Sequence, residues 1–185
     1  MATNEIQPYV GPRPFERDDK KRFFGREREA RDLCSLVIAE PVVLVYAPSG
    51  TGKSSLVDAC VVDLLEQKQF EVLPTVRVRG AIPDHLLTNG KSLNPYVFNS
   101  ILRLESGKIS SYDLTSLSLP QYLEKRKRLS DREGSPCPRA LILDQCEELF
   151  DSYSLERGEH RKDFFSQLAQ ALAEDRMLRL LLVMR

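Results

Sequence analysis

The chain has 185 residues, 42% of them apolar and 29% charged, which excludes a disordered chain and allows one domain that buries roughly 70% of its unfolded surface. Lys plus Arg and Asp plus Glu each number 27, so no net charge draws the chain toward nucleic acid or an anionic membrane. The apolar runs fall well short of the ~18 residues of a membrane helix and the start has no signal-peptide pattern, so we expect a cytoplasmic protein.

The first part of the chain is predicted to alternate between helix and strand. Residues 1–25 are rich in proline and aromatic residues, and we expect them to form an extended N-terminal strap. Apolar residues at helical spacing predict a helix that begins near Arg26 and ends at Pro41. The run VVLVY at 42–46 is typical of a strand buried on both faces in a parallel sheet, and KSSLVDACVVDLLEQ at 53–67 predicts the next helix.

The middle of the chain gives weaker signals. FEVLPTVRVRG at 70–80 predicts a second strand, in which Pro74 indicates a bend or an edge position. A variable insertion follows at about 80–135, and within it we expect helices near 96–104 and 120–129.

Two further apolar strands are predicted, RALILDQ at 139–145 and LRLLLVMR at 178–185, with an amphipathic helix between them at 160–175. Strands that alternate with helices predict an α/β fold, a three-layer α/β/α sandwich with a mainly parallel sheet whose core spans 26–185. Because the chain stops directly after a strand with no covering helix, we expect it to be a fragment of a longer protein.

The stretch APSGTGKSS at 47–55 joins a strand to a helix and predicts a phosphate site. Its pattern is G-x-x-x-x-G-K-S/T, except that Ala47 takes the place of the first glycine. Backbone N–H groups and the helix dipole favour an anion there, Lys53 is expected between the β- and γ-phosphates, and the Ser54 hydroxyl is expected on Mg²⁺. The expected nucleotide contacts are Pro48, Ser49, Gly50, Thr51, Gly52, Lys53, Ser54 and Ser55.

A second group of candidate residues follows the strand at 139–145. Asp144 ends this strand, where it is expected to share the metal with Ser54, and either Glu147 or Glu148 is expected to polarise an attacking water. Arg185 would reach the γ-phosphate if its strand lies between the other two; otherwise it is a solvated charge. The expected catalytic residues are Lys53, Asp144, Glu147, Glu148 and Arg185.

Four segments in order resemble the STAND NTPases, most closely the novel STAND NTPase type: PYVGPRPFERDDKKRFFGREREARDL, LVYAPSGTGKSSLVDA, LILDQCEELF and LLVMR. The resemblance implies a P-loop NTPase of the AAA+-related ASCE division, cut before its lid and winged helix. It also implies that Phe24, Gly25 and Arg26 bind adenine, although Phe23 and Phe24 could instead serve as a hydrophobic staple for the next helix. Ala47 and Cys146, which stands where an aromatic residue is usual, depart from the family pattern.

The resemblance further implies a function and partners. The module would bind ATP/ADP with Mg²⁺ and hydrolyse slowly, cycling between an ADP-bound closed form and an ATP-bound form that self-associates. Sensor and effector domains would lie outside these residues. Two alternatives stay open: a nucleotide-locked scaffold without turnover, and an AAA+ ATPase associated with DNA. A GTPase is disfavoured, because no NKxD segment occurs.

Other charged and reactive residues give no clear site. EKRKR at 124–128 is either a nucleic-acid patch or, as we favour, the solvated face of a helix. An arginine that acts in trans on a neighbouring site could be Arg126, Arg128 or Arg132. The cysteines have no paired spacing, so we expect buried, reduced thiols rather than a zinc site or a disulfide framework.

Overall fold

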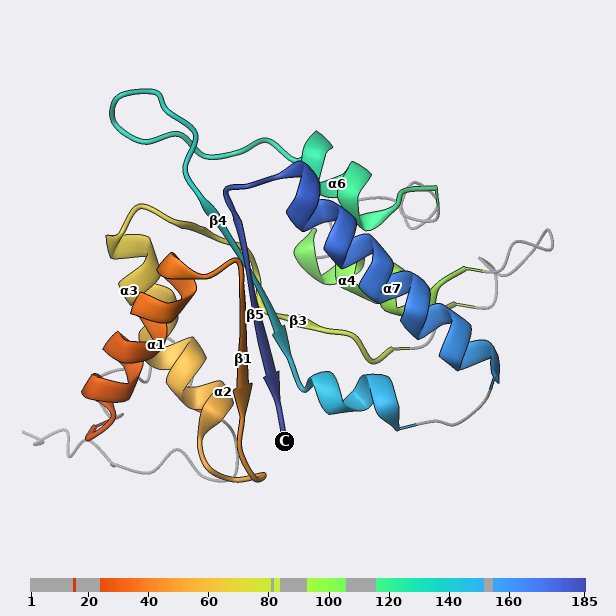
Figure 1. Cartoon of the computed structure of the whole chain (residues 1–185), viewed down its shortest axis with the longest axis horizontal. Helices are drawn as coiled ribbons and strands as arrows, with labels where there is room; N and C mark the ends of the chain where they lie inside the picture. The colour runs from red at the N-terminus through yellow and green to blue at the C-terminus, as the bar shows by residue number, and fades with distance from the viewer. Residues whose placement is uncertain (1–14, 16–23, 81, 84–92, 106–115, 152–154) are drawn as a thin grey trace, which may run out of the picture.

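The computed structural model describes Phe15 and residues 24–80, 82–83, 93–105, 116–151 and 155–185 (Figure 1). Its sheet has the order β1-β5-β4-β2, with β3 also paired to β4, and all pairs are parallel. The strands are β1 (Val42–Tyr46), β2 (Glu71–Val72), β3 (Val76–Arg77), β4 (Arg139–Asp144) and β5 (Leu178–Met184). The last strand therefore lies between the other two long strands.

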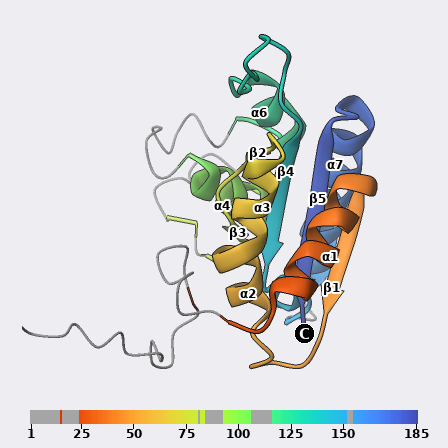
Figure 2. The ribbon, with the colours of Figure 1, turned by 90° about the vertical axis from the view of Figure 1, so that its left-hand side faces the viewer.

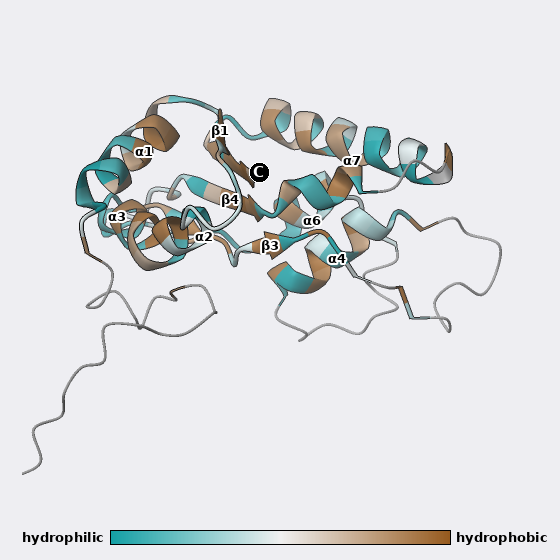
Figure 3. Ribbon diagram, turned by 90° about the horizontal axis from the view of Figure 1, so that it is seen from below, coloured by the Kyte–Doolittle hydropathy of each residue, from teal (hydrophilic) through white to brown (hydrophobic). Residues whose placement is uncertain are grey.

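Helices cover both faces of this sheet, which confirms the three-layer architecture (Figures 1 and 2). One face carries α1 (Glu27–Ala39), α2 (Lys53–Leu56), η2 (Val57–Val61) and α3 (Val62–Gln67). The other face carries α4 (Pro95–Leu104), α6 (Leu119–Lys125) and α7 (Leu155–Glu174), while the short η4 (Cys146–Phe150) follows β4. Figure 3 shows the hydrophobic strands β1, β3 and β4 between these helices.

Strand alternation divides the interior into two cores. In β4, Leu141 and Leu143 pack with α4, α6 and α7, whereas Ala140 and Ile142 pack with α1 and α3. Successive strand side chains point to opposite faces, so a fully apolar strand such as β4 serves both cores. Every residue of β4 is buried.

Local chemistry explains where the helices of the insertion begin. The side chain of Asn94 accepts hydrogen bonds from the amides of Tyr96 and Val97 at the start of α4. Ser118 and Gln121 form a reciprocal capping box at the start of α6. Both helices also have a proline in the first turn, where a missing N–H costs nothing. The expected helices near 96–104 and 120–129 are therefore present, the second ending earlier, at Lys125.

The prediction that residues 42–46 are buried on both faces is wrong. Val43 is buried under α1, but Leu44 and Tyr46 are 55% and 70% exposed. The reason is helix placement: among the described residues α1 packs on the Val43 side of β1, whereas α7, on the other face of the sheet, contacts β5. The expected bend at Pro74 is present, since it separates the two short strands β2 and β3.

The prediction of a solvated face for EKRKR is wrong for its first and last arginines. Arg126 Nη1 lies 3.2 Å from Glu105 Oε1, and Arg128 pairs with Asp175. These pairs join α6 and the loop after it to α4 and α7. Both arginines are thus occupied in ion pairs, which also argues against a role for either in trans.

No helix in the described residues combines the length and the apolar character needed to cross a lipid bilayer.

Candidate nucleotide site

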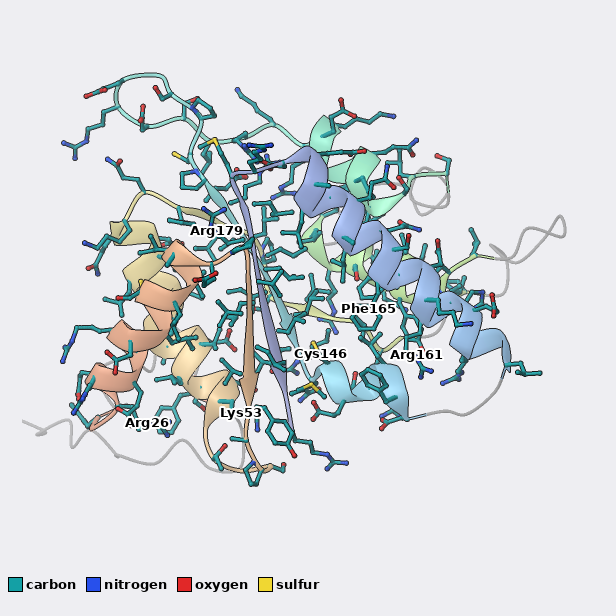
Figure 4. The ribbon with its side chains drawn as sticks, viewed as in Figure 1. Arg26, Lys53, Cys146, Arg161, Phe165 and Arg179 are labelled. Carbon is teal, nitrogen blue, oxygen red and sulfur yellow. The ribbon has the colours of Figure 1, made fainter. Side chains whose placement is uncertain are left out.

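The carboxyl ends of β1, β3, β4 and β5 lie at the same edge of the parallel sheet (Figure 1). Ligands of open α/β sheets bind at this edge. The loop at 47–52 joins β1 to α2 there, and Lys53 and Arg26 lie beside it (Figure 4). The predicted site residues therefore come from loops that the sheet holds together.

The loop has the backbone that its two glycines permit. Gly50 and Gly52 have φ values of 81° and 79°, in the left-handed region that favours glycine. Thr51 Oγ1 donates to the carbonyl of Pro48 at 2.9 Å and closes the turn. Ala47 is not among the residues with positive φ, and its amide donates to Met184 in β5 at 3.4 Å. Alanine at this position therefore needs no strained backbone.

The ammonium of Lys53 lies across the loop. Its Nζ donates to the carbonyls of Ala47 and Pro48, at 2.6 and 2.9 Å. Lys53 is also the first residue of α2, whose free amides face the loop. A cation and helix amides thus converge where an anion would bind.

Ser54 and Asp144 meet although 90 residues separate them in the sequence. Ser54 Oγ donates to Asp144 Oδ1 at 3.0 Å. Asp144 is only 2% exposed, so its carboxylate is withdrawn from bulk water. A hydroxyl and a carboxylate are the oxygen ligands that Mg²⁺ prefers in proteins, and this pair fits the expected metal site.

Arg77 is a residue of this site that the sequence analysis missed. Its Nη2 lies 3.3 Å from Asp144 Oδ2. The register explains the contact, because β3 pairs with β4 so that Arg77 lies opposite Asp144. The only signal in the sequence was the position of this arginine near the end of the predicted strand at 70–80.

The two glutamates after β4 have different neighbours. Gln145 has a left-handed backbone (φ 59°) and turns the chain into η4. Glu147 Oε2 accepts a hydrogen bond from the amide of Arg185, 3.2 Å away. Glu148 Oε2 is buried and has no hydrogen-bond partner among the described residues. Burial raises the pKa of Glu148, and the charge of Arg79 opposes this rise.

Cys146, directly before Glu147, is a core residue. It belongs to the core under α4, α6 and α7, and its thiol donates to the carbonyl of Leu143. Burial raises the pKa of Cys146 to about 12, so the thiol is protonated at neutral pH and unreactive. Cys34 and Cys137 are also buried, and none of the four cysteines forms a disulfide in the described part of the chain.

The segment before α1 contacts the phosphate loop. Arg26 Nη1 donates to the carbonyl of Thr51 at 3.1 Å, and the Ser55 hydroxyl accepts from the amide of Phe15 at 3.0 Å. Phe24 is 73% exposed, so it does not act as the alternative hydrophobic staple. The rest of the expected strap at 1–25 lies largely outside the described residues.

The remaining candidate arginines lie at both ends of the sheet. Arg185 is exposed and directly follows β5, at the edge that carries Lys53 and Asp144. Arg132 is exposed in the loop that leads into the amino end of β4, away from this edge (Figure 1).

One strand of the parallel sheet leads into a glycine loop and a helix that begins with lysine, and another strand ends in a buried aspartate. These features define a P-loop NTPase. The family model of Novel STAND NTPase 1 matches residues 8–185, so the chain belongs to this family. It is an NTPase module of the STAND kind.

A solved structure supports the fold. The Walker-type ATPase PABY2304 of Pyrococcus abyssi is similar to this chain, with a TM-score of 0.61 and 18% sequence identity. The match covers 94% of this chain and 48% of the neighbour, so the chain spans about half of the neighbour's length. At this identity the similarity shows the fold alone. No curated protein matches the chain.

Proposed function

We propose that the chain is the ATP-binding and slowly hydrolysing switch module of a STAND signalling or defence regulator. The observation that carries this proposal is the 3.0 Å hydrogen bond from Ser54 to the buried Asp144, which joins the phosphate loop to the end of β4. A serine hydroxyl and an aspartate carboxylate held together beside a phosphate loop are the oxygen ligands that a nucleotide-bound magnesium ion requires.

Ser54 and Asp144 hold Mg²⁺ in this proposal, and Lys53 binds the phosphates. Bound with the nucleotide, the metal neutralises charge on the phosphate oxygens. Lys53 is able to exchange its bonds to the carbonyls of Ala47 and Pro48 for stronger, charge-assisted bonds to phosphate. The loop from Pro48 to Ser55 supplies amides around the anion, and Gly50 and Gly52 allow the close approach.

Glu147 is the residue that we assign to water activation. Its contact with Arg185 places it at the end of β5, the strand between those that lead to Lys53 and to Asp144. Glu148 interacts with the charges of Arg79 and Arg77, on the side of β3. Arg185 follows β5, and its own amide donates to Glu147. Its guanidinium would bind the γ-phosphate.

The adenine is expected at Phe24, Gly25 and Arg26. Arg26 binds the loop carbonyl of Thr51, and the exposed ring of Phe24 lies in the same segment, so a base next to the phosphates would meet this segment. Gly25, with φ 82°, turns the backbone there. ATP and ADP from the cytoplasm would be the nucleotides.

Switching is proposed from family membership rather than from geometry. The ADP form would be closed and the ATP form competent for self-association, with sensor and effector domains in other parts of the protein. The alternative of a DNA-associated ATPase gains no support from EKRKR, because Arg126 and Arg128 are occupied by Glu105 and Asp175.

Titration calorimetry with ATP, ADP and GTP in magnesium tests the nucleotide assignment. We expect ATP and ADP to bind and GTP to bind at least tenfold more weakly. Equal binding of GTP, or no binding of either adenine nucleotide, would contradict the proposal. A phosphate-release assay then separates the switch from the nucleotide-locked scaffold, since a scaffold would release no phosphate above the rate of a Lys53→Ala variant.

A further inference from the structure

The two carboxylate oxygens of Asp144 have different partners. Oδ1 accepts from the Ser54 hydroxyl at 3.0 Å, and Oδ2 accepts from Arg77 Nη2 at 3.3 Å. The side chain of Asp144 is 3% exposed, whereas that of Arg77 is 40% exposed. A short carboxylate is therefore held from two sides, by the proposed metal ligand on one oxygen and by a longer, partly exposed cation on the other.

The side chains of Arg77 and Asp144 point to the same face of the sheet. Val76 and Val78 are buried in the core under α4, so strand alternation turns Arg77 to the opposite face. Ile142 packs in the core under α1 and α3, and Asp144, two residues further along β4, therefore points to that same face. Arg77 and Asp144 lie opposite each other in the β3–β4 register, and Ser54 lies in the first turn of α2, which covers this face.

We propose that Arg77 is a positioning residue for the magnesium site: it holds Oδ2 of Asp144 so that Oδ1 stays toward Ser54. This inference rests on the proposed function. The guanidinium binds the oxygen that Ser54 does not, so it leaves the metal side of the carboxylate free. Groups that orient a metal ligand from behind are a general feature of metal sites, and their loss weakens metal binding.

The sharpest readout is the gain in ATP affinity that magnesium provides, measured as the ratio of the dissociation constants in EDTA and in excess Mg²⁺. Arg77→Met removes the hydrogen bond and the charge but keeps an unbranched side chain. We expect it to lower this gain about tenfold, with ATP affinity in EDTA unchanged. Arg77→Lys restores a point charge without the planar fork, and we expect an intermediate gain.

Arg79→Met is the matched control. Arg79 lies two residues further on, is exposed, and lowers the pKa of Glu148. The Arg79→Met variant loses the same positive charge next to the same strand end. We therefore expect magnesium to increase its ATP affinity as much as in the wild type. An equal reduction of the gain in Arg77→Met and Arg79→Met would overturn the proposal. It would show that the loss of positive charge, and not the contact with Asp144, causes the effect.

Two further results would overturn the positioning role. An unchanged gain in Arg77→Met would show that Asp144 needs no support, and an increased gain would show that Arg77 competes with the metal. If Arg77→Met does not fold, Arg77→Lys decides, because a wild-type gain in that variant contradicts the proposal. If magnesium does not increase the ATP affinity of the wild-type chain, the proposed function fails as well. If magnesium increases it equally in the wild type and in Arg77→Met, only this inference is refuted.

Discussion

The two ends of the sheet each have a buried carboxylate beside an arginine, but the pairs differ in how completely they are satisfied. At the amino end, Arg139 is 2% exposed and donates to Glu71 Oε2 at 2.8 Å and to the carbonyls of Leu123 and Arg126. At the carboxyl end, the partly exposed Arg77 makes one long hydrogen bond to Asp144. The first pair fixes β2, β4 and the end of α6 to one another.

This difference indicates which end is built for stability and which for binding. The bonds of Arg139 are short and lead only to protein groups. Asp144 instead divides its oxygens between the Ser54 hydroxyl and the partly exposed Arg77, at 3.0 and 3.3 Å. A pocket of about 570 Å³ adjoins Arg139, Arg126 and Arg128, and all three of these arginines are engaged in ion pairs with protein carboxylates.

The largest expected effect tests the amino end. Arg139→Met leaves the 8% exposed side chain of Glu71 buried without its main partner. Removal of one member of a buried pair costs about 3–5 kcal/mol, and we expect this loss in the free energy of unfolding in urea. The double variant Arg139→Met with Glu71→Leu should recover much of it. A single variant with wild-type stability would contradict the structural role of this pair.

The next effect tests water activation at the carboxyl end. Glu147→Gln should lower the rate of phosphate release about a hundredfold, because an amide cannot accept the proton of the water. Glu148→Gln is the matched control and should retain most of the activity. The reverse result would assign activation to Glu148, and negligible release by the wild-type chain would favour the nucleotide-locked scaffold.

Lys53→Ala should change binding and spare stability, unlike the change at Arg139. Loss of a charged hydrogen-bond donor costs about 2 kcal/mol, or roughly thirtyfold in ATP affinity. The urea midpoint should stay near the wild-type value, since within the described residues the Lys53 ammonium donates to the Ala47 and Pro48 carbonyls of its own loop. ATP binding as tight as in the wild type would remove Lys53 from the site.

The smallest effect concerns the pH dependence of stability. The pKa of Glu148 is raised above its ordinary value of 4.5, chiefly by burial, so the folded chain binds this proton more tightly than the unfolded chain. This group therefore favours folding below pH 4.5 and opposes folding once the pH rises through its folded pKa. Glu148→Gln should be slightly more stable than the wild type at pH 7, and this advantage should disappear at pH 4. An advantage that grows toward acid pH would contradict the raised pKa.

The sequence predicted what depends on local chemistry. The left-handed glycines of the loop and the buried apolar strand before Asp144 are confirmed in the structure, and the last strand takes the central position that the sequence analysis gives only as a condition. These features follow from the backbone needs of glycine and from the continuous burial of parallel strands. The roles of Lys53, Glu147, Arg185 and the residues from Phe24 to Arg26 remain predictions.

Pairing across the sheet could not be predicted in the same way. A run such as VVLVY does not reveal whether helices cover both faces, and in the described residues Leu44 and Tyr46 are exposed while α7 contacts β5. Arg126 finds Glu105 across 21 residues, and Arg77 finds Asp144 across 67. Such contacts depend on register and helix placement, which a local pattern does not contain.

A crystal structure of the chain with magnesium and a non-hydrolysable ATP analogue tests the central claim most directly. The account predicts the triphosphate against the amides of residues 50–54, with the metal between the Ser54 hydroxyl and Asp144 in place of their hydrogen bond. An analogue bound elsewhere, or a loop that stays empty at a saturating concentration of the analogue, would contradict it.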